Sequence, residues 1–344
     1  MRFEVIITTY NRPVSVASLV NRILCCEPTP MSVIVVDSSD IENTKLQETE
    51  NVKYIRSSHK NQPYQRYLGF MASHEEIVCF FDDDITITNP SIFEIILNRY
   101  SDNSIVGCNV KFINEGKITV QKKLNNGKYL NSKSKIGKFM LLLTGVPPIE
   151  EGKAWLAGMR GEDVSNSFTE TFAGPGGLSF RRHIVPSLFD YTLFALFENK
   201  MAMGEDKFIS LGALQFGKLA HSNETCIVHS ENSSNYYQDY RSFARKELYS
   251  RLWLSVKYLK VKGRWIGWGY IHYYWFACWR LFISALHFFL QPKKANFQIF
   301  YGKCLAVIDT VHKPFKAKYL CPSINWDSEF AKDLESLNTE CKDR

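Results

Sequence analysis

Short apolar runs alternate with amphipathic segments over residues 1–110 of the chain. Most of these runs are almost entirely apolar, which is typical of strands buried on both faces of a parallel sheet. Between them, apolar residues recur at helical spacing. The expected strands span residues 3–9, 32–37, 52–56, 76–81 and 104–110, and the expected helices span residues 15–25, 64–72 and 91–100. This alternation predicts an α/β fold with a mostly parallel sheet flanked by helices.

The pattern changes further along the chain. Residues 114–168 carry Lys and Asn runs followed by the apolar stretch KFMLLL, and we expect an excursion from the sheet there. Residues 171–182 form a Gly-rich segment that predicts a turn leading into a strand, and residues 204–217 begin a helix. From about residue 240 the chain is helical, basic and aromatic.

Charge separates this last region from the rest. The chain has 42 basic and 35 acidic residues, a net charge of +7. Residues 241–320 hold 15 Lys or Arg and only two acidic residues, so they carry more than the whole net charge. We therefore expect an α/β domain over 1–240 and a helical extension over 241–344 that associates with a membrane or forms an oligomer.

An aromatic segment, residues 265–290, lies within this extension. Apolar or aromatic side chains fill 20 of its 26 positions, and basic residues flank it on both sides. Trp and Tyr bordered by Lys and Arg are typical of a helix at a membrane interface. A charge at the centre of a bilayer, such as Arg280 would be, costs about 3 kcal/mol. We expect an interfacial helix on an anionic surface, with a single span or a helix packed in a core or dimer interface as the alternatives.

Composition narrows the class of protein. The chain has 344 residues, 45% hydrophobic and 22% charged, which excludes a disordered chain and a fibrous repeat. Nine cysteines at irregular spacing, without a CxxC pair, fit neither a zinc ribbon nor a disulfide framework. The apolar stretch after Met1 is too short for a signal peptide. We expect a protein of a reducing compartment.

Three consecutive aspartates, Asp82, Asp83 and Asp84, follow the fourth expected strand. Open α/β sheets bind ligands at this end of their strands. Mg²⁺ or Mn²⁺ would bridge the carboxylates to the diphosphate of a nucleotide sugar, which a carboxylate does not bind directly. In an extended segment Asp82 and Asp84 would point to one side and Asp83 to the other. The alternative is a solvated acidic turn.

Other polar residues at element ends are candidates for the same site. Asp37 ends the second strand and either accepts a hydrogen bond from a nucleobase or ribose or caps the next turn. Glu205 and Asp206 open a helix, where an acid is either a general base or a capping residue. His229 is either a metal ligand or a structural residue at a strand end.

The segment GGLSFRR adds glycines and arginines to the candidates. Gly176 and Gly177 would let the backbone approach a phosphate or sugar closely, and a plain tight turn is the alternative. Arg181 and Arg182 either pair with phosphates or are surface charges.

In their order and spacing, several segments resemble the motifs of family 2 glycosyltransferases of the GT-A fold. These segments are ITTYNRP, VVDSSD, QRYLGF, FFDDDI, GGLSFRR and GEDKF, within roughly residues 3–230. The resemblance implies a GT-A, Rossmann-like sheet and inverting transfer of a sugar from a nucleoside-diphosphate sugar, with a UDP-sugar favoured. The acceptor would be a hydroxyl of a glycan or lipid-linked molecule in cell-surface polysaccharide synthesis. The chain lacks the QxxRW motif of processive synthases, which favours addition of a single sugar.

The resemblance also implies a role for each matched residue. Asp206 would be the inverting general base. Asp84 would hold Mn²⁺ or Mg²⁺, and His229 would complete the metal shell. The acceptor or its sugar would contact Gly176, Gly177 and Glu205. The donor nucleotide would contact Thr8, Tyr10, Arg12, Asp37, Arg66, Asp82 and Asp83.

Two other functions remain open from the sequence. A metal-dependent nucleotidyltransferase would share the acidic metal site, but the YNRP turn is not the Gly-rich, Lys-bearing loop that binds a triphosphate. A non-catalytic sugar-binding or membrane-scaffold protein would need neither the three aspartates nor Asp206.

The expected partners follow from these features. They are the nucleotide sugar, the acceptor and an anionic membrane surface contacted through residues 241–320, with self-association left open. Nucleic acid is not expected, because the aromatic segment is too apolar for a solvated groove. The expected location is cytoplasmic, peripheral on the inner face of the cell membrane.

Overall fold

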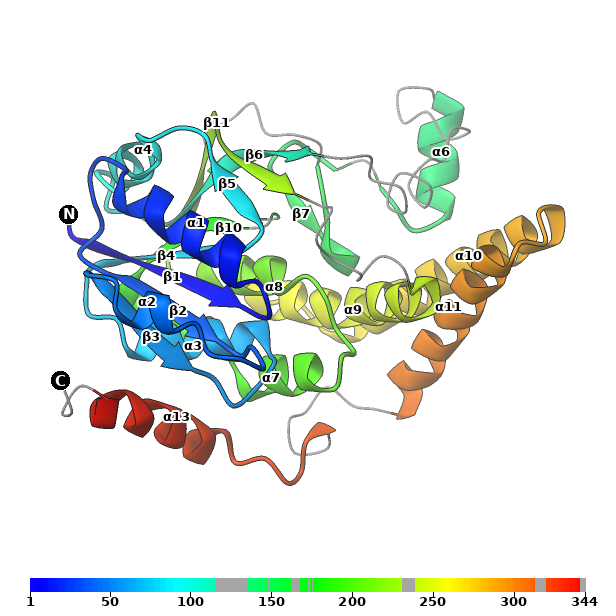
Figure 1. Cartoon of the computed structure of the whole chain (residues 1–344). Helices are drawn as coiled ribbons and strands as arrows, with labels where there is room; N and C mark the ends of the chain where they lie inside the picture. The colour runs from blue at the N-terminus through cyan, green and yellow to red at the C-terminus, as the bar shows by residue number, and fades with distance from the viewer. Residues whose placement is uncertain are drawn as a thin grey trace.

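A nine-stranded mixed sheet forms the centre of the protein, with helices on both faces (Figure 1). The computed structural model describes residues 1–115, 135–147, 149–161, 168–172, 174, 176–230, 239–312 and 320–340. The strands of the large sheet are β1 (Phe3–Thr9), β2 (Val33–Asp37), β3 (Val52–Arg56), β4 (Ile77–Asp82), β5 (Ile85–Ile87), β6 (Ile105–Glu115), β9 (Phe168–Thr169), β10 (Gly176–Arg181) and β11 (Lys218–Ser230). Their order is β3-β2-β1-β4-β10-β6-β11-β5, and β9 pairs with β11.

Helices connect and cover these strands. In the first part of the chain they are α1 (Pro13–Leu24), α2 (Thr44–Gln47), α3 (Gln62–Met71), α4 (Ile92–Arg99) and α6 (Lys135–Leu143). Later helices are α7 (Tyr191–Glu198), α8 (Glu205–Ala213), α9 (Tyr240–Val261), α10 (Gly267–Leu290), α11 (Lys294–His312) and α13 (Trp326–Glu340). The 3-10 turns are η1 (Leu156–Gly158), between the short paired strands β7 (Ala154–Trp155) and β8 (Met159–Arg160), and η2 (Arg182–Ser187).

The strands β3, β2, β1 and β4 run parallel to one another. Strand β10 is antiparallel to β4 and β6, and β11 is parallel to β6. The prediction of a mostly parallel sheet flanked by helices is therefore confirmed. The register pairs Thr8 with Asp82 and Thr9 with Asp37, so the polar ends of β1, β2 and β4 meet at one edge.

Alternate residues of the parallel strands enter two different cores. Ile6, Ile34 and Phe80 belong to one core, and Val5 and Phe81 belong to the other. Both faces of this part of the sheet are therefore buried, which explains why its strands are continuous apolar runs in the sequence. Helix α1 covers one face with the side of Val16, Leu19, Val20 and Ile23, as its spacing predicts.

The excursion expected over 114–168 contains α6, the β7–β8 hairpin with its turn η1, and β9, while residues 116–134 and 162–167 lie outside the described part. The helical extension is present from α9 onward. Helix α10 coincides closely with the aromatic segment 265–290. No helix in the described part of the chain is long and apolar enough to cross a membrane. Helix α13 returns to the sheet, where Asp333 accepts hydrogen bonds from Ser58 and Tyr64.

Candidate active site

Carboxylates gather where the parallel strands end. Strand β4 ends at Asp82, and the chain turns through Asp83 and Asp84 before it enters β5. Helix α8 brings Glu205 and Asp206 to the same place in its first turn. We call these five residues, Asp82, Asp83, Asp84, Glu205 and Asp206, the acidic edge.

Arg66 on α3 joins the two halves of the acidic edge. Its Nη2 lies 2.8 Å from Asp82 Oδ1, and its Nη1 lies 2.8 Å from Asp206 Oδ1 and 3.6 Å from Glu205 Oε1. The side chain is 1% exposed. Burial alone would lower the pKa of Arg66, but these carboxylates raise it above its usual value. The sequence pointed to a nucleobase contact for Arg66. The structure instead places it between strand and helix carboxylates, and a nucleobase contact stays a prediction.

Burial changes the acidity of this cluster. Desolvation, together with neighbouring carboxylates, raises the pKa of Asp82 to about 7 and that of Glu205 to about 8. Arg66 opposes both shifts but does not cancel them. Ionisation of Asp82 and Glu205 is therefore disfavoured in the protein alone, and a bound cation would favour it.

Arg12 holds the other two aspartates. Its Nη1 lies 2.6 Å from Asp83 Oδ1 and 3.0 Å from Asp84 Oδ2, while Thr9 Oγ1 donates to Asp83 Oδ2 at 2.7 Å. Asp83 and Asp84 thus share one partner, and Asp82 faces Arg66. The segment is not extended at Asp83 and Asp84, because the chain turns there, so the alternation expected for a strand does not apply to it.

Asp84 and His229 form the candidate metal-binding pair. Asp84 Oδ1 is buried and accepts no hydrogen bond from the described residues, and His229 Nε2 of β11 lies 3.5 Å away. Burial raises the pKa of Asp84, but His229 and Arg12 outweigh it and hold the pKa below its usual value. A carboxylate oxygen without a hydrogen bond and an imidazole nitrogen are suitable donors for Mn²⁺ or Mg²⁺. No group of three or more His, Cys, Asp or Glu in the described residues is arranged to hold a metal, so further ligands would come from the substrate.

The residues expected at the nucleobase line the next two strand ends. Asp37 accepts hydrogen bonds from the Ser39 backbone at 2.7 Å and from the Tyr54 hydroxyl at 2.6 Å, so it does cap the turn that follows it. Thr8 is buried beside Asp82 in the register of β1 and β4. Tyr10 is 43% exposed, and its hydroxyl accepts a hydrogen bond from Lys60.

The glycines of GGLSFRR lie in β10, which pairs with the strand that carries Asp82. Gly176 pairs with Phe81 next to an irregularity in the register. Gly177 has a φ of 69°, and a Cβ there would lie 2.7 Å from Ile227 Cδ1, so both conformation and space require glycine. Arg181 and Arg182 donate to backbone carbonyls, including those of Ile105 and Ser73, and neither contacts the acidic edge.

Sequence reasoning missed two residues at the acidic edge. Gln62 Nε2 donates to Asp82 Oδ1 at 2.7 Å, and Thr9 donates to Asp83. Gln62 had a usable signal, because it lies four residues before Arg66 and therefore on the same face of α3. Thr9 had no such signal beyond its position at the end of a strand.

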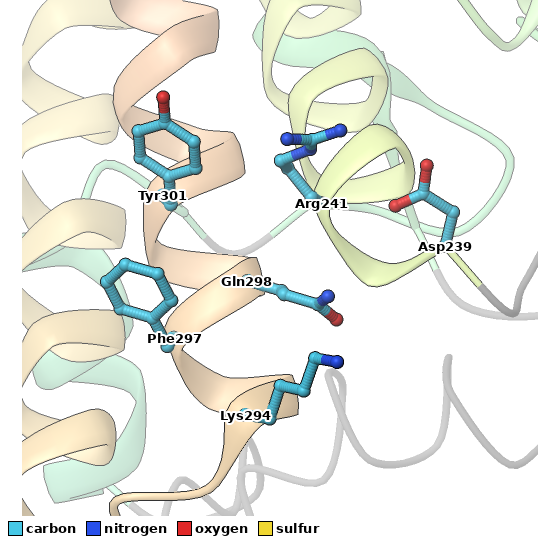
Figure 2. Close-up of a pocket in the computed structure, with 6 residues that line it drawn as sticks. All are labelled: Asp239, Arg241, Lys294, Phe297, Gln298 and Tyr301. Carbon is cyan, nitrogen blue, oxygen red and sulfur yellow. The ribbon is translucent and has the colours of Figure 1, made fainter.

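A surface pocket of about 330 Å³ lies apart from the acidic edge, between the start of α9 and α11 (Figure 2). Its lining residues are Asp239, Arg241, Lys294, Phe297, Gln298 and Tyr301. None of them belongs to the candidate active site.

The chain is similar to known proteins in sequence and in fold. Residues 4–156 match the model of Glycosyl transferase family 2. A mannosyltransferase, PcManGT from Pyrobaculum calidifontis, solved in complex with GDP-Man and Mn²⁺, is similar in structure with a TM-score of 0.51 and 12% identity. The similarity covers 91% of this chain and 88% of that one. No curated protein sequence matches.

Residues 1–349 of S. aureus TarS are also similar, with a TM-score of 0.42 and 15% identity over 76% of this chain and 71% of that one. The likeness to PcManGT shows a GT-A-like fold that extends beyond the residues of the family match. Over residues 4–156 the chain is therefore similar to glycosyl transferase family 2.

Proposed function

We propose that this protein is an inverting, metal-dependent glycosyltransferase that moves one sugar from a nucleoside-diphosphate sugar to a hydroxyl of a glycan or lipid-linked acceptor. The observation that carries the proposal is the convergence of Asp84 and Asp206 on one edge of the sheet. Arg66 pairs with both Asp206 and Asp82, and Asp82 lies two residues before Asp84, so the candidate base lies near the candidate metal ligand. Neither a nucleotidyltransferase nor a sugar-binding scaffold would need both.

In this reaction Asp206 accepts the proton of the acceptor hydroxyl as that hydroxyl attacks the anomeric carbon. Arg66 orients the Asp206 carboxylate through the contact at 2.8 Å. Glu205, which is 9% exposed and lies 3.6 Å from Arg66, would line the acceptor side. Asp84 and His229 would hold Mn²⁺ or Mg²⁺, which supplies positive charge for the departing diphosphate.

The donor nucleotide would lie along the ends of β1 and β2. Asp37, Thr8 and the exposed ring of Tyr10 are grouped there, beside Arg12. Two nucleobases, uracil and guanine, are to be distinguished. PcManGT was solved with GDP-Man and Mn²⁺, whereas the motifs of this chain favour a UDP-sugar. A thermal-shift comparison of UDP and GDP, each with Mn²⁺ and with EDTA, identifies the base: we expect stabilisation only with Mn²⁺.

The base assignment is tested by Asp206→Asn. The variant keeps an oxygen that accepts a hydrogen bond from Arg66 but does not take a proton at neutral pH, so turnover should fall about 10²- to 10⁴-fold. Sugar transfer is measured as nucleoside-diphosphate release in the presence of acceptor, and nucleotide binding should change little.

Asp190→Asn is the matched control, because Asp190 caps α7 through the Leu193 backbone and lies outside the acidic edge. If both variants lose the same small fraction of activity, Asp206 is a capping residue and the proposal is wrong.

We further propose that the enzyme works on the cytoplasmic face of a membrane. Helix α10 and the turn before it expose large apolar residues, among them Trp265 in the turn and Phe289 and Leu290 in the helix, each at least 70% exposed. Helix α6 adds exposed Ile136 and Phe139, and its end contacts α10, where Trp275 donates to the Leu143 carbonyl. Apolar and aromatic side chains bordered by Lys and Arg fit an anionic lipid surface. The cysteines of the described part are free thiols, which agrees with a reducing compartment.

Vesicle co-sedimentation tests this location. The full chain should bind vesicles that contain phosphatidylglycerol more strongly than vesicles of phosphatidylcholine. Phe289→Ser with Leu290→Ser should weaken binding, while Ile41→Ser, which is 84% exposed on the nucleotide side, should not. Equal binding by all three proteins would remove the membrane from the proposal.

A further inference from the structure

The helices α9, α10 and α11 hold several basic side chains around one carboxylate. Arg251 donates to Glu247 Oε1 through Nη2 at 2.7 Å and through Nε at 3.1 Å. Arg280 on α10 and Lys303 on α11 act electrostatically on the same carboxylate. Lys207, on α8, is affected by the charges of Arg251 and Glu247. We call Lys207, Arg251, Arg280 and Lys303 the basic cluster.

The basic cluster is not neutralised within the described part of the chain. Lys303 is 8% exposed and forms no ion pair or hydrogen bond there. The Arg280 guanidinium lies over the ring of Phe276 and interacts with Glu247 without forming an ion pair within 4 Å in the described residues. The other acid of these helices, Asp309, is paired with Arg245 at 2.5 Å. Arg251, Arg280 and Lys303 therefore share the carboxylate of Glu247, while Lys207 interacts with both Glu247 and Asp206. Buried charge without a partner costs several kcal/mol, so such an excess indicates a place where an anion binds.

Solvent reaches this cluster. The side chain of Glu247 is 30% exposed and that of Arg251 is 23% exposed, although protein atoms surround both. The cluster is thus partly exposed at Glu247 and Arg251, and an anion from solution would enter on that side. Arginine and lysine side chains together are the usual protein partners of phosphate oxygens.

The position of the basic cluster relates it to the reaction. Lys207 directly follows Asp206, the proposed base, and donates from Nζ to the Gly158 carbonyl at 2.9 Å. Arg251 donates to the neighbouring Ala157 carbonyl at 2.8 Å, so both cations are fixed on the turn η1. From there the cluster continues along α9 to α10 and α11, which extend away from the sheet in Figure 1.

We propose that the basic cluster binds a phosphate or diphosphate group carried by the sugar acceptor. This inference rests on the proposed function, because Asp206 defines where the acceptor hydroxyl lies. An acceptor with its hydroxyl at Asp206 and its phosphate in the basic cluster would extend toward the exposed apolar side of α10. That order of sugar, phosphate and apolar chain fits an acceptor anchored in lipid.

The acidity of the lysines agrees with this proposal. Burial, together with the charge of Arg280, lowers the pKa of Lys303 to about 8. Burial and the charges of Arg251 and Arg160 lower the pKa of Lys207 to about 7. A bound phosphate would supply the negative charge that these ammonium groups lack.

Calorimetric titration of the full chain with inorganic pyrophosphate tests the proposal. EDTA is present throughout, so that no metal brings pyrophosphate to the acidic edge. Wild type should bind, and Lys303→Met should weaken binding at least tenfold. Lys260→Met is the control, because Lys260 is exposed on the same helix bundle and lies outside the cluster. Unchanged binding by Lys303→Met and by Arg280→Gln would overturn the proposal.

A second arm identifies the source of the phosphate. Farnesyl diphosphate in detergent should bind more tightly than inorganic pyrophosphate if the acceptor carries a lipid, and equal affinities indicate a soluble phosphorylated acceptor. Lys303→Met should also melt higher than wild type without anion, because it removes an uncompensated charge. A lower melting temperature together with full pyrophosphate binding would make Lys303 a structural partner of Glu247 and contradict the proposal.

The same proteins are titrated with UDP or GDP and Mn²⁺. If nucleotide binding is missing while pyrophosphate binding depends on Lys303, the proposed function fails and the anion site remains. If nucleotide binding is normal and Lys303 has no effect, only the anion site fails.

Discussion

The acidic edge and the basic cluster are opposite in charge, but in both of them charged groups of one sign outnumber those of the other. Five carboxylates at the edge face two guanidinium groups, those of Arg12 and Arg66. In the basic cluster, Arg251, Arg280 and Lys303 act on Glu247, and Lys207 interacts with Glu247 and Asp206. Each region therefore lacks counter-charge of one sign, and we assign a metal ion to the first and a phosphate to the second.

The two regions are also built differently. At the acidic edge, the register of parallel strands sets where the side chains meet, and consecutive residues supply three of the five carboxylates. The basic cluster is assembled from four helices whose members are far apart in sequence. The comparison teaches that an unbalanced site at a sheet edge is visible as a short motif, whereas one between helices is visible only after folding.

The largest expected effect comes from removing the buried cation of the acidic edge. The Arg66 side chain is 1% exposed, and Arg66→Met removes the cation that Asp82, Asp206 and Glu205 share. Removing one partner of a buried ion pair lowers the free energy of unfolding by about 3–5 kcal/mol. Thermal and urea unfolding measure the loss.

Arg2→Met is the control for Arg66→Met, since Arg2 forms an exposed pair with Glu75 and such pairs contribute under about 1 kcal/mol. Similar losses for both variants would contradict the central position that we give to Arg66.

Much of the acidic edge could be predicted from sequence because its chemistry follows strand ends. Asp82, Asp83 and Asp84 come after an apolar run, and the helix start at Gly204 marks Glu205 and Asp206. The strands 3–9 and 52–56 were predicted with the bounds that the structure has. Periodicity sets these features locally, so no tertiary information was needed.

The rest depended on contacts between distant segments. Nothing in the spacing of residues shows that Arg66 contacts Asp206, which lies 140 positions later. The turn at Asp83 and Asp84 was not visible either, since an acidic run fits a strand end and a turn equally well. The charge excess of 241–320 was apparent from sequence, but the shared use of Glu247 by Arg251, Arg280 and Lys303 was not.

The second prediction concerns the dependence of stability on pH. As the pH rises, the acidic edge should lose stability and the basic cluster should gain it. Burial and the charge of Asp206 raise the pKa of Glu205 to about 8, against about 4.3 in an unfolded chain. The folded protein binds this proton more tightly, so the contribution of Glu205 to stability is complete below pH 4 and is lost as the pH rises to 8. Lys303, with its pKa lowered to about 8, contributes fully above pH 10 and loses that contribution as the pH falls through 8.

Melting temperatures from pH 5 to pH 10 in metal-free buffer measure both slopes. Glu205→Gln should flatten the fall between pH 5 and 8, and Lys303→Met should flatten the rise between pH 8 and 10. Each group contributes at most about 1.4 kcal/mol per pH unit. If both variants show the same dependence of melting temperature on pH as wild type, Glu205 and Lys303 do not carry the pKa shifts given above.

The smallest expected effect on stability comes from backbone conformation rather than from charge. It is tested with two glycines, one at the acidic edge and one beside the helices of the basic cluster. Gly177 at the acidic edge and Gly263 in the turn between α9 and α10 have similar left-handed φ values of 69° and 61°. A Cβ on Gly177 would lie 2.7 Å from Ile227 and 2.8 Å from Val110, whereas a Cβ on Gly263 meets nothing within 4 Å.

Both alanine variants therefore carry the same backbone strain of about 1 kcal/mol, and only Gly177→Ala adds the cost of overpacking, about 1–3 kcal/mol. Unfolding free energies of the two variants measure the difference directly. A larger loss for Gly177→Ala, with weaker nucleotide binding, would show that close packing of β10 against β11 and β6 fixes the geometry beside Asp82. Equal losses would mean that the edge tolerates displacement of β10, and that its carboxylates are positioned by Arg66 and Arg12 alone.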